Sequence, residues 1–236
     1  MTSIDQSAQT APPSVFLRGV RDAAPIMLGF IPFGLVLGAQ ATQKGMTTAE
    51  VPLMTALNFG GGSEFAAVAL WTSPPHLALI AAVTLLINCR HILMGAALVP
   101  YFKGQPLRKV LPALFLLCDE TWALVLAQGR STGRIGLRYY MGAALTLYGT
   151  WVLCTAAGAI AGPVFGDITQ YGFDMAFPAV FLVMLAGMWK GVRGALPWLA
   201  SLIAACAACL WLPGAWYVPA GTVAGLITAV LLAEAA

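Results

Sequence analysis

Three polar clusters interrupt a chain that is otherwise strongly apolar, and their side chains are of types that bind charged groups or transfer protons. In chain order the members are Gly60, Gly61, Gly62, Ser63 and Glu64, then Asn88, Arg90 and His91, then Asp119 and Glu120. A guanidinium can hold a carboxylate through two hydrogen bonds, an imidazole titrates near neutral pH, and a carboxylate can carry a proton. This combination suits a site that binds a small charged molecule and moves protons.

The middle cluster lies inside an apolar stretch that runs from Leu77 to Tyr101. About 25 residues of α-helix cross a hydrocarbon core of about 30 Å, so this stretch is expected to span a membrane. Arg90 then lies near the midplane, where a cation costs at least ~2.5 kcal/mol. Such a cost persists only where the group is paired, hydrated or used, so we expect Arg90 and His91 to face a polar pathway.

The composition points to a membrane protein independently. Of the 236 residues, 60% are hydrophobic and 9% are charged, whereas soluble domains are about 25% charged. We predict an all-α, polytopic integral membrane helical bundle with about eight hydrophobic segments, surrounded by the lipid bilayer. Residues 1–15 are expected to form a polar cytoplasmic tail without signal-peptide features, and residues 16–236 a single transmembrane domain. The net charge of +3 is too small to indicate a nucleic-acid partner.

The eight predicted segments must position the polar clusters. Their approximate bounds are 16–42, 48–72, 77–101, 110–128, 137–161, 175–189, 195–212 and 217–234. The second contains the three glycines, each of which costs ~1 kcal/mol relative to Ala in a helix interior. We therefore expect a break there, buried in protein or lining a cavity, with Ser63 capping the second half. A continuous helix with a glycine-lined contact is the alternative. The fourth segment is expected to carry Asp119 and Glu120 at its centre.

The basic residues between the segments favour one topology. If all segments cross the membrane from a cytoplasmic N-terminus, Lys44, Lys103, Arg108 and Lys109 lie outside. If the second and fourth segments are instead re-entrant, Lys44 is the one basic residue left outside. The charge bias therefore favours two re-entrant segments, and both topologies place both termini in the cytoplasm.

The ionisable residues at membrane depth come from three consecutive segments. Arg90 is expected to pair with one of the three carboxylates, and Asp119 and Glu120 cannot both face it because adjacent helix positions point ~100° apart. Burial and like charge both disfavour ionised carboxylates, so Glu64, Asp119 and Glu120 are candidates for proton coupling. The alternatives are a purely structural ion pair and, for His91, a hydrogen bond to a backbone carbonyl.

Other chemistries find less support in the sequence. No HExxH-like metal spacing and no recognisable nucleophile context occurs, so we predict no enzyme activity, no metal and no cofactor. Cys206 and Cys209 lie in an Ala-rich apolar run, where small packing residues are expected rather than a redox pair. An intramembrane acid–base enzyme and a channel or structural subunit remain the alternative functions.

The order and spacing of four motifs resemble those of the AzlC family, the large subunits of bacterial branched-chain amino acid exporters. The motifs are Pro25 with Pro32-Phe33-Gly34, Gly60-Gly61-Gly62-Ser63-Glu64-Phe65, Asn88-Cys89-Arg90-His91, and Asp119-Glu120. The resemblance extends over roughly residues 16–232. One departure is Glu64, because the family usually has Gln at this position.

The resemblance implies a secondary transporter that exports branched-chain or similar apolar amino acids across the bacterial inner membrane, with a small AzlD-type membrane subunit as partner. The site chemistry is compatible with such a substrate. Arg90 can hold the α-carboxylate, a carboxylate or the bared carbonyls at the glycine break can take the ammonium, and proton exchange can drive export. The predicted substrate-binding residues are Gly60, Gly61, Gly62, Ser63, Glu64, Asn88, Arg90 and His91. Four Gly-xxx-Gly steps, together with the resemblance, also suggest a helix surface for the small partner.

Overall fold

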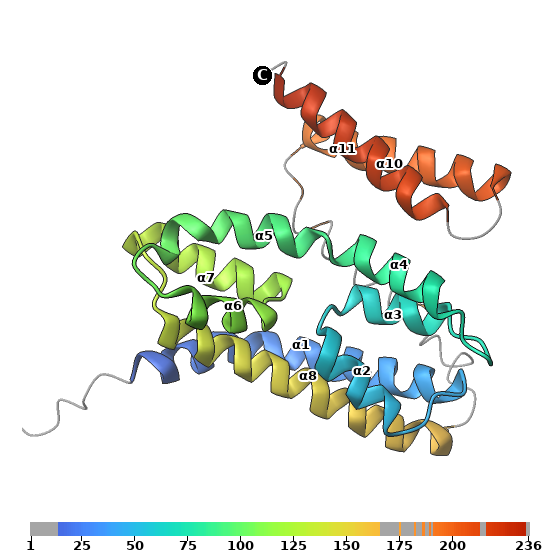
Figure 1. Ribbon diagram of the computed structural model, residues 1–236, viewed down its shortest axis with the longest axis horizontal. Coiled ribbons are helices and arrows are strands. Elements are labelled where there is room, and N and C mark those ends of the chain that lie inside the picture. The colour runs from blue at the N-terminus through green and yellow to red at the C-terminus, as the bar shows by residue number, and fades with distance from the viewer. Residues whose placement is uncertain are drawn as a thin grey trace, which may run out of the picture.

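The computed structural model describes residues 14–165, 175, 182, 186, 189, 191–212 and 216–234, and their regular structure is helical (Figure 1). The elements are α1 (Val15–Gln43), α2 (Glu50–Asn58), α3 (Gly62–Ala69), α4 (Leu77–Asn88), α5 (Arg90–Leu98), the 3₁₀ turn η1 (Val99–Phe102), α6 (Leu107–Phe115), α7 (Asp119–Thr132), α8 (Leu137–Phe165), α10 (Val192–Trp211) and α11 (Tyr217–Glu234).

Several of these helices could cross a membrane. Within the described residues, four are long and apolar enough: Val15–Gln43, Leu77–Phe102, Leu137–Val164 and Val192–Trp211. The predicted all-α membrane fold is therefore confirmed. The count of eight segments is not confirmed, because the second and fourth segments are broken into short helices. The predicted sixth segment, 175–189, and the tail before residue 14 fall largely or wholly outside the described residues.

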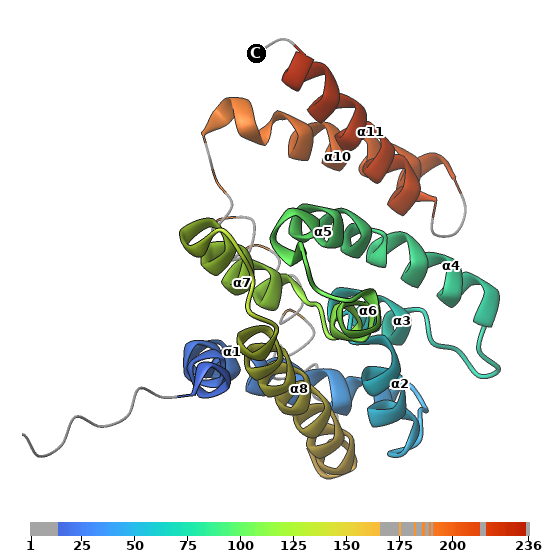
Figure 2. The same cartoon turned by 60° about the vertical axis from the view of Figure 1, so that its left-hand side comes forward.

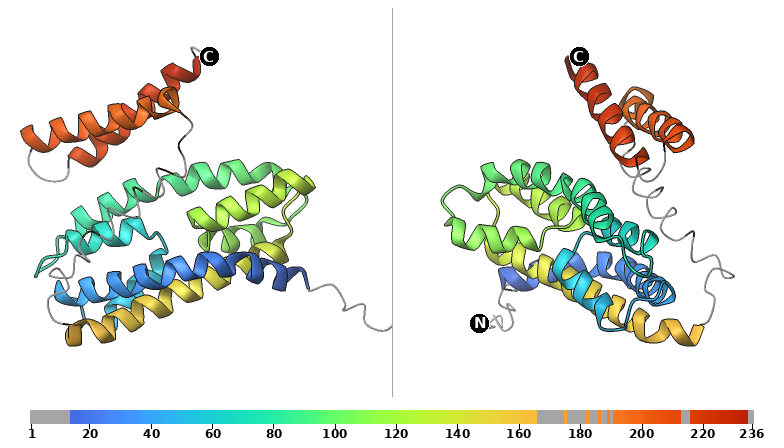
Figure 3. Two further views of the ribbon diagram at one scale, coloured as in Figure 1. Left: turned by 180° about the vertical axis from the view of Figure 1, so that it is seen from behind. Right: turned by 45° about the vertical axis from the view of Figure 1, so that its right-hand side comes forward.

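The long helices α1 and α8 pack side by side in the same direction (Figure 3). Gly19 lies against Tyr139, and further along both helices Gly38 lies against Thr155. A Cβ added at either glycine would collide with backbone of the other helix, so the close approach requires glycine. The Gly-xxx-Gly steps of the two helices, Gly34/Gly38 and Gly158/Gly162, thus pack within the chain.

In the part of the sequence between α1 and α8, the chain forms two helical hairpins that enter the bundle from opposite ends. In Figure 1, α2 runs inward from the right-hand end and α3 returns towards it, whereas α6 and α7 do the same from the left. Two contacts hold α2 of the first hairpin on α8: the hydroxyls of Thr55 and Thr155 lie 2.9 Å apart, and Tyr148 donates to the carbonyl of Ala56 at 2.9 Å. This arrangement is the one that the charge bias favours, with both broken segments turning back at the middle.

The first hairpin turns at the glycines for two separate reasons. Gly61 has φ +55°, a conformation that residues with a Cβ rarely adopt. Gly60 has no room for a Cβ, which would collide with Ser63 Oγ and lie 2.7 Å from Asn88 Oδ1. The predicted break is therefore correct. The predicted cap is wrong, because Gly61 is the N-cap of α3 and Ser63 lies one position inside the helix.

The second hairpin turns immediately before the acidic pair. Cys118 is extended, with φ −125° and ψ 174°, and α7 begins at Asp119. The expected central position of Asp119 and Glu120 in the fourth segment therefore corresponds to the turn of this hairpin. Acidic side chains are stabilised at a helix N-terminus, where the unpaired N–H groups give positive potential, so the pair starts a helix more favourably than it interrupts one.

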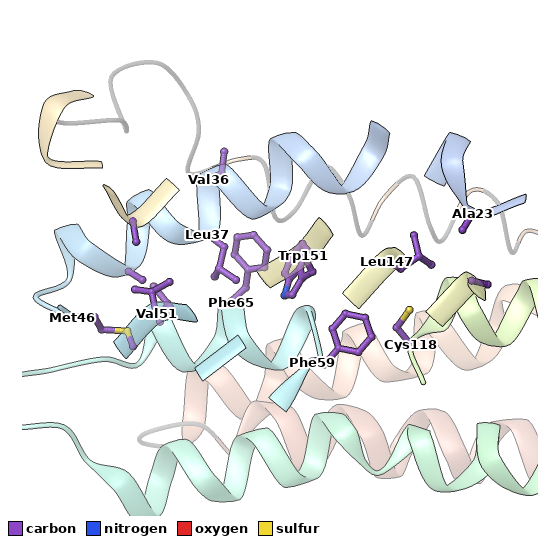
Figure 4. Packing of buried hydrophobic residues seen from close by; sticks show 14 residues of the cluster. Ala23, Val36, Leu37, Met46, Val51, Phe59, Phe65, Cys118, Leu147 and Trp151 are labelled. Atoms are coloured by element: carbon purple, nitrogen blue, oxygen red, sulfur yellow. The ribbon is translucent and has the colours of Figure 1, made fainter. Parts of the chain in front are cut away.

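The central span comprises α4, α5 and η1 and runs past both hairpin turns (Figure 2). Its two halves meet at Cys89, whose φ −57° and ψ −23° keep the chain close to helical. Two apolar clusters complete the core: one packs α2 and α3 against α1 and α8 (Figure 4), and the other packs α5, α6 and α7 against α8. Outside this body, α10 and α11 pack on each other, with Gly221 and Gly225 against α10.

Candidate functional site

Arg90 joins the turns of the two hairpins at the middle of the central span. Its NH1 lies 3.0 Å from Oδ2 of Asp119, the first residue of α7. Its NH2 donates to the carbonyl of Gly60 at 3.1 Å. Asp119 is therefore the carboxylate that pairs with the central cation. One side chain connects three segments that lie far apart in the sequence.

The ion pair is partly accessible and not fully satisfied. The side chains of Arg90 and Asp119 are 31% and 25% exposed. Arg90 Nε is buried and has no hydrogen-bond partner. The guanidinium therefore has a spare donor in addition to the two nitrogens that hold Asp119 and Gly60.

Glu64 occupies a closed position beside this pair. It is 0% exposed, its Oε1 accepts from the amide of Gly60 at 3.2 Å, and its Oε2 accepts from the indole N–H of Trp151 at 2.6 Å. The Gly60 residue is consequently held at both ends, through its N–H by Glu64 and through its carbonyl by Arg90. Figure 4 shows Trp151 beside Phe65 in the apolar cluster that surrounds this carboxylate.

A short chain of amides links the first turn to the central span. Asn58 donates to Ser63 Oγ at 2.8 Å, and Asn88 donates to Asn58 Oδ1 at 2.8 Å. The Oδ1 atom of Asn88 is buried without a partner. Ser63 and Asn88, both predicted as site residues, thus lie against the glycine turn, and each is oriented by Asn58.

Two other predicted residues lie less centrally. His91 Nδ1 is 3.1 Å from the backbone carbonyl of Asn88, which is the arrangement of the backbone-satisfied alternative. Glu120 follows Asp119 in the first turn of α7. No described cation lies within ion-pair distance of Glu120, because Arg90 pairs with its neighbour.

Sequence reasoning missed two residues that build the site. Asn58 could have been found, since it is a polar residue in an apolar segment directly before the turn. Trp151 carried no such signal, because an aromatic residue in an apolar helix is most often simple packing. Its role depends on α8 lying against the first hairpin, which only the fold reveals.

The chemistry available at this site is that of binding charged groups. Arg90 and Asp119 offer one positive and one negative group at the same point, and the glycine turn adds backbone polar groups. Among the described residues, no group of three or more His, Cys, Asp or Glu side chains is arranged to hold a metal ion.

Comparison with known proteins relates the chain to a family of membrane proteins. A family model described as AzlC protein matches residues 25–165, the part that runs from within α1 to the end of α8 and contains the whole site. No solved structure matches the chain significantly.

Three related proteins match the chain significantly. The inner membrane protein YgaZ of Escherichia coli (strain K12) is 28% identical over 95% of this chain and 94% of its own length. The branched-chain amino acid transport protein AzlC of Bacillus subtilis (strain 168) is 27% identical over 70% of this chain and 64% of its own. A membrane protein of Archaeoglobus fulgidus, described as uncharacterised, is 28% identical over 81% of both chains.

Proposed function

The chain belongs to the AzlC family, and from this premise we propose that it is a secondary transporter subunit that exports branched-chain or similar apolar amino acids. The observation that carries the proposal is the position of Arg90. A cation at the middle of a membrane span, held between the turns of two helical hairpins, is placed where transporters bind substrate.

Substrate binding is assigned to the glycine turn and the facing part of the central span. Arg90 binds the α-carboxylate, for which its fork geometry is suited. The other residues that we assign to substrate binding are Gly60, Gly61, Gly62, Ser63, Glu64, Asn88 and His91. In this assignment the hairpin turns supply the polar groups, and the apolar side chains around them accept an aliphatic substrate.

Proton coupling is assigned to the carboxylates, with Glu64 as the leading candidate ahead of Asp119 and Glu120. Glu64 is fully buried and has no ion pair among the described residues. A charged carboxylate removed from water without a counter-ion is costly, and binding a proton removes that cost. Protonated Glu64 would hold the amide of Gly60 less strongly, and Gly60 also contacts Arg90. A single residue would thereby link the proton site to the substrate site.

The proposed assembly includes a small AzlD-type membrane subunit in the bacterial inner membrane, with both termini of this chain in the cytoplasm. The Gly-xxx-Gly steps of α1 and α8 are filled by each other, and Gly221 and Gly225 pack on α10. Gly187 lies outside the described residues. We therefore propose that the partner binds to a surface that does not include these three Gly-xxx-Gly steps.

The proposal is tested by counterflow of labelled leucine and valine in proteoliposomes, with and without the co-expressed partner. We expect exchange that requires the partner and responds to an imposed proton gradient. If neither amino acid is exchanged in the presence of the partner, the transport function is refuted. If the rate of exchange is the same with and without the proton gradient, proton coupling is refuted.

A further inference from the structure

We propose that an amino acid binds by inserting into the Arg90–Asp119 ion pair, with its carboxylate on Arg90 and its ammonium on Asp119. This inference rests on the proposed transport function and gives Asp119 direct contact with the substrate. It also restricts the ligand to molecules that carry both charges, which is a narrower class than carboxylates or amines.

The first argument is access. Arg90 and Asp119 are 31% and 25% exposed, so both charged groups can be reached by a small molecule. Glu64 is 0% exposed, and its two oxygens already accept from Gly60 and Trp151. Of these two carboxylates near the first turn, Asp119 is the one that is open to an incoming ammonium.

The second argument is the number of hydrogen-bond donors that the guanidinium has left. One N–H of NH2 donates to the carbonyl of Gly60, and NH1 pairs with Asp119, while each of these nitrogens carries a second N–H. Nε is buried without a partner. When Asp119 moves from NH1 to the ammonium of the ligand, Arg90 keeps its contact with the first hairpin. The two N–H groups of NH1 then become available to the carboxylate of the ligand.

The third argument is charge balance. Removing one partner of this partly buried ion pair is unfavourable because the other charge is left uncompensated. A ligand with only a carboxylate would leave Asp119 unpaired, and a ligand with only an ammonium would leave Arg90 unpaired. A zwitterion compensates both Arg90 and Asp119, so the net charge of the site is unchanged and neither side chain is left without a counter-charge. The ion pair therefore selects against ligands that carry a single charge.

The first measurement needs no variant. The full chain, purified alone and with its co-expressed partner, is titrated with leucine, with 4-methyl-2-oxopentanoate, which lacks the ammonium, and with 3-methylbutylamine, which lacks the carboxylate. Ligand binding is read as a shift in thermal unfolding, which rises with ligand concentration over Kd. We expect both single-charge analogues to bind at least about 30-fold more weakly than leucine.

The second measurement uses Asp119→Asn, with Glu50→Gln as the control on an exposed carboxylate at the start of α2, which has no assigned role. Asp119→Asn removes the ammonium site and leaves Arg90 without its counter-ion. Leucine should then bind at least about 30-fold more weakly, whereas the oxo acid should bind more tightly than it does to the wild type. Glu50→Gln should keep the preference for leucine.

The outcomes separate this inference from the transport function. Equal binding of leucine and the oxo acid by the wild type would overturn the inference, and this result is decisive even if Asp119→Asn fails to fold. Retention of the leucine preference by folded Asp119→Asn would overturn it as well. If the wild type binds leucine in either of these two outcomes, the proposed transport function is not refuted. If the wild type binds no branched-chain amino acid, with or without the partner, the proposed transport function is refuted.

Discussion

Trp151 donates its indole N–H to Oε2 of Glu64 at 2.6 Å, and this contact ties the long helix α8 to the first hairpin. The other oxygen of Glu64 holds the amide of Gly60, whose carbonyl in turn accepts from Arg90. A residue on the α1–α8 scaffold is thereby connected to the central cation through a short series of hydrogen bonds. The position of the first turn depends on this series.

Replacing Trp151 by Phe removes the indole donor and keeps an aromatic ring. Because a hydrogen bond contributes about 0.5–1.5 kcal/mol between neutral groups and about 1.5–3 kcal/mol to a charged group, we expect the free energy of unfolding in detergent to fall by about 0.5–3 kcal/mol, depending on the protonation of Glu64. Trp122→Phe is the matched control, since Trp122 Nε1 is buried without a hydrogen-bond partner. An equal loss in the two variants would show that ring volume, and not the bond to Glu64, accounts for the effect.

The parallel packing of α1 and α8 predicts a large difference between two glycines of the same helix. A Cβ at Gly38 would collide with the backbone of α8, whereas a Cβ at Gly29 meets nothing within 4 Å. Gly38→Ala should therefore cost roughly 1–3 kcal/mol of stability, and Gly29→Ala should be neutral or stabilise by up to ~1 kcal/mol. Thermal unfolding of the purified variants measures both, and similar values for the two would contradict the close helix contact.

The hairpin topology predicts which residues face the outside of the cell. In a cysteine-free background, a cysteine in place of Lys44 should react with an impermeant thiol reagent in intact cells, and one in place of Lys103 should not. The reason is that Leu77–Phe102 crosses the bundle once, so the two positions lie at opposite ends, and the excess of basic residues at the Lys103 end assigns that end to the cytoplasm. Labelling of both positions from outside would contradict the arrangement.

Much of the scaffold could be predicted from apolar length alone. The first helix, the central span and the fifth segment were expected within a few residues of α1, Leu77–Phe102 and α8. The break at the glycines could also be predicted, because three glycines in a row are unfavourable inside a helix. A break in the fourth segment follows from the charge bias, but its position at Cys118 could not be predicted, since the residues before Asp119 are ordinary helix-forming apolar types.

Which residues belong to the candidate site is easier to predict from the sequence than which contacts these residues make. The three carboxylates were equivalent as partners of Arg90, because the choice depends on where the second hairpin turns. The bond between Trp151 and Glu64 joins residues 87 positions apart, and no local pattern encodes it. Residue types at membrane depth therefore predict the members of the candidate site, and the packing of the hairpins on α8 determines the contacts between them.

The role of Glu64 in proton coupling predicts a change in pH dependence. Glu64→Gln preserves shape but cannot exchange a proton, so substrate exchange should remain measurable and vary less with pH. Some stability should also be lost, since the amide NH₂ would face a donor from either Gly60 or Trp151. Exchange against pH, measured beside Glu120→Gln, tests this role. An unchanged profile in Glu64→Gln with a flattened one in Glu120→Gln would move the proton site to α7.

The central claim is that Arg90 binds the substrate, and equilibrium binding of labelled leucine to Arg90→Lys tests it most directly. Lysine keeps the charge but lacks the fork that reaches both Gly60 and Asp119. At matched amounts of monodisperse protein, we predict binding at least about 30-fold weaker than that of the wild type. Wild-type affinity in Arg90→Lys would contradict the account.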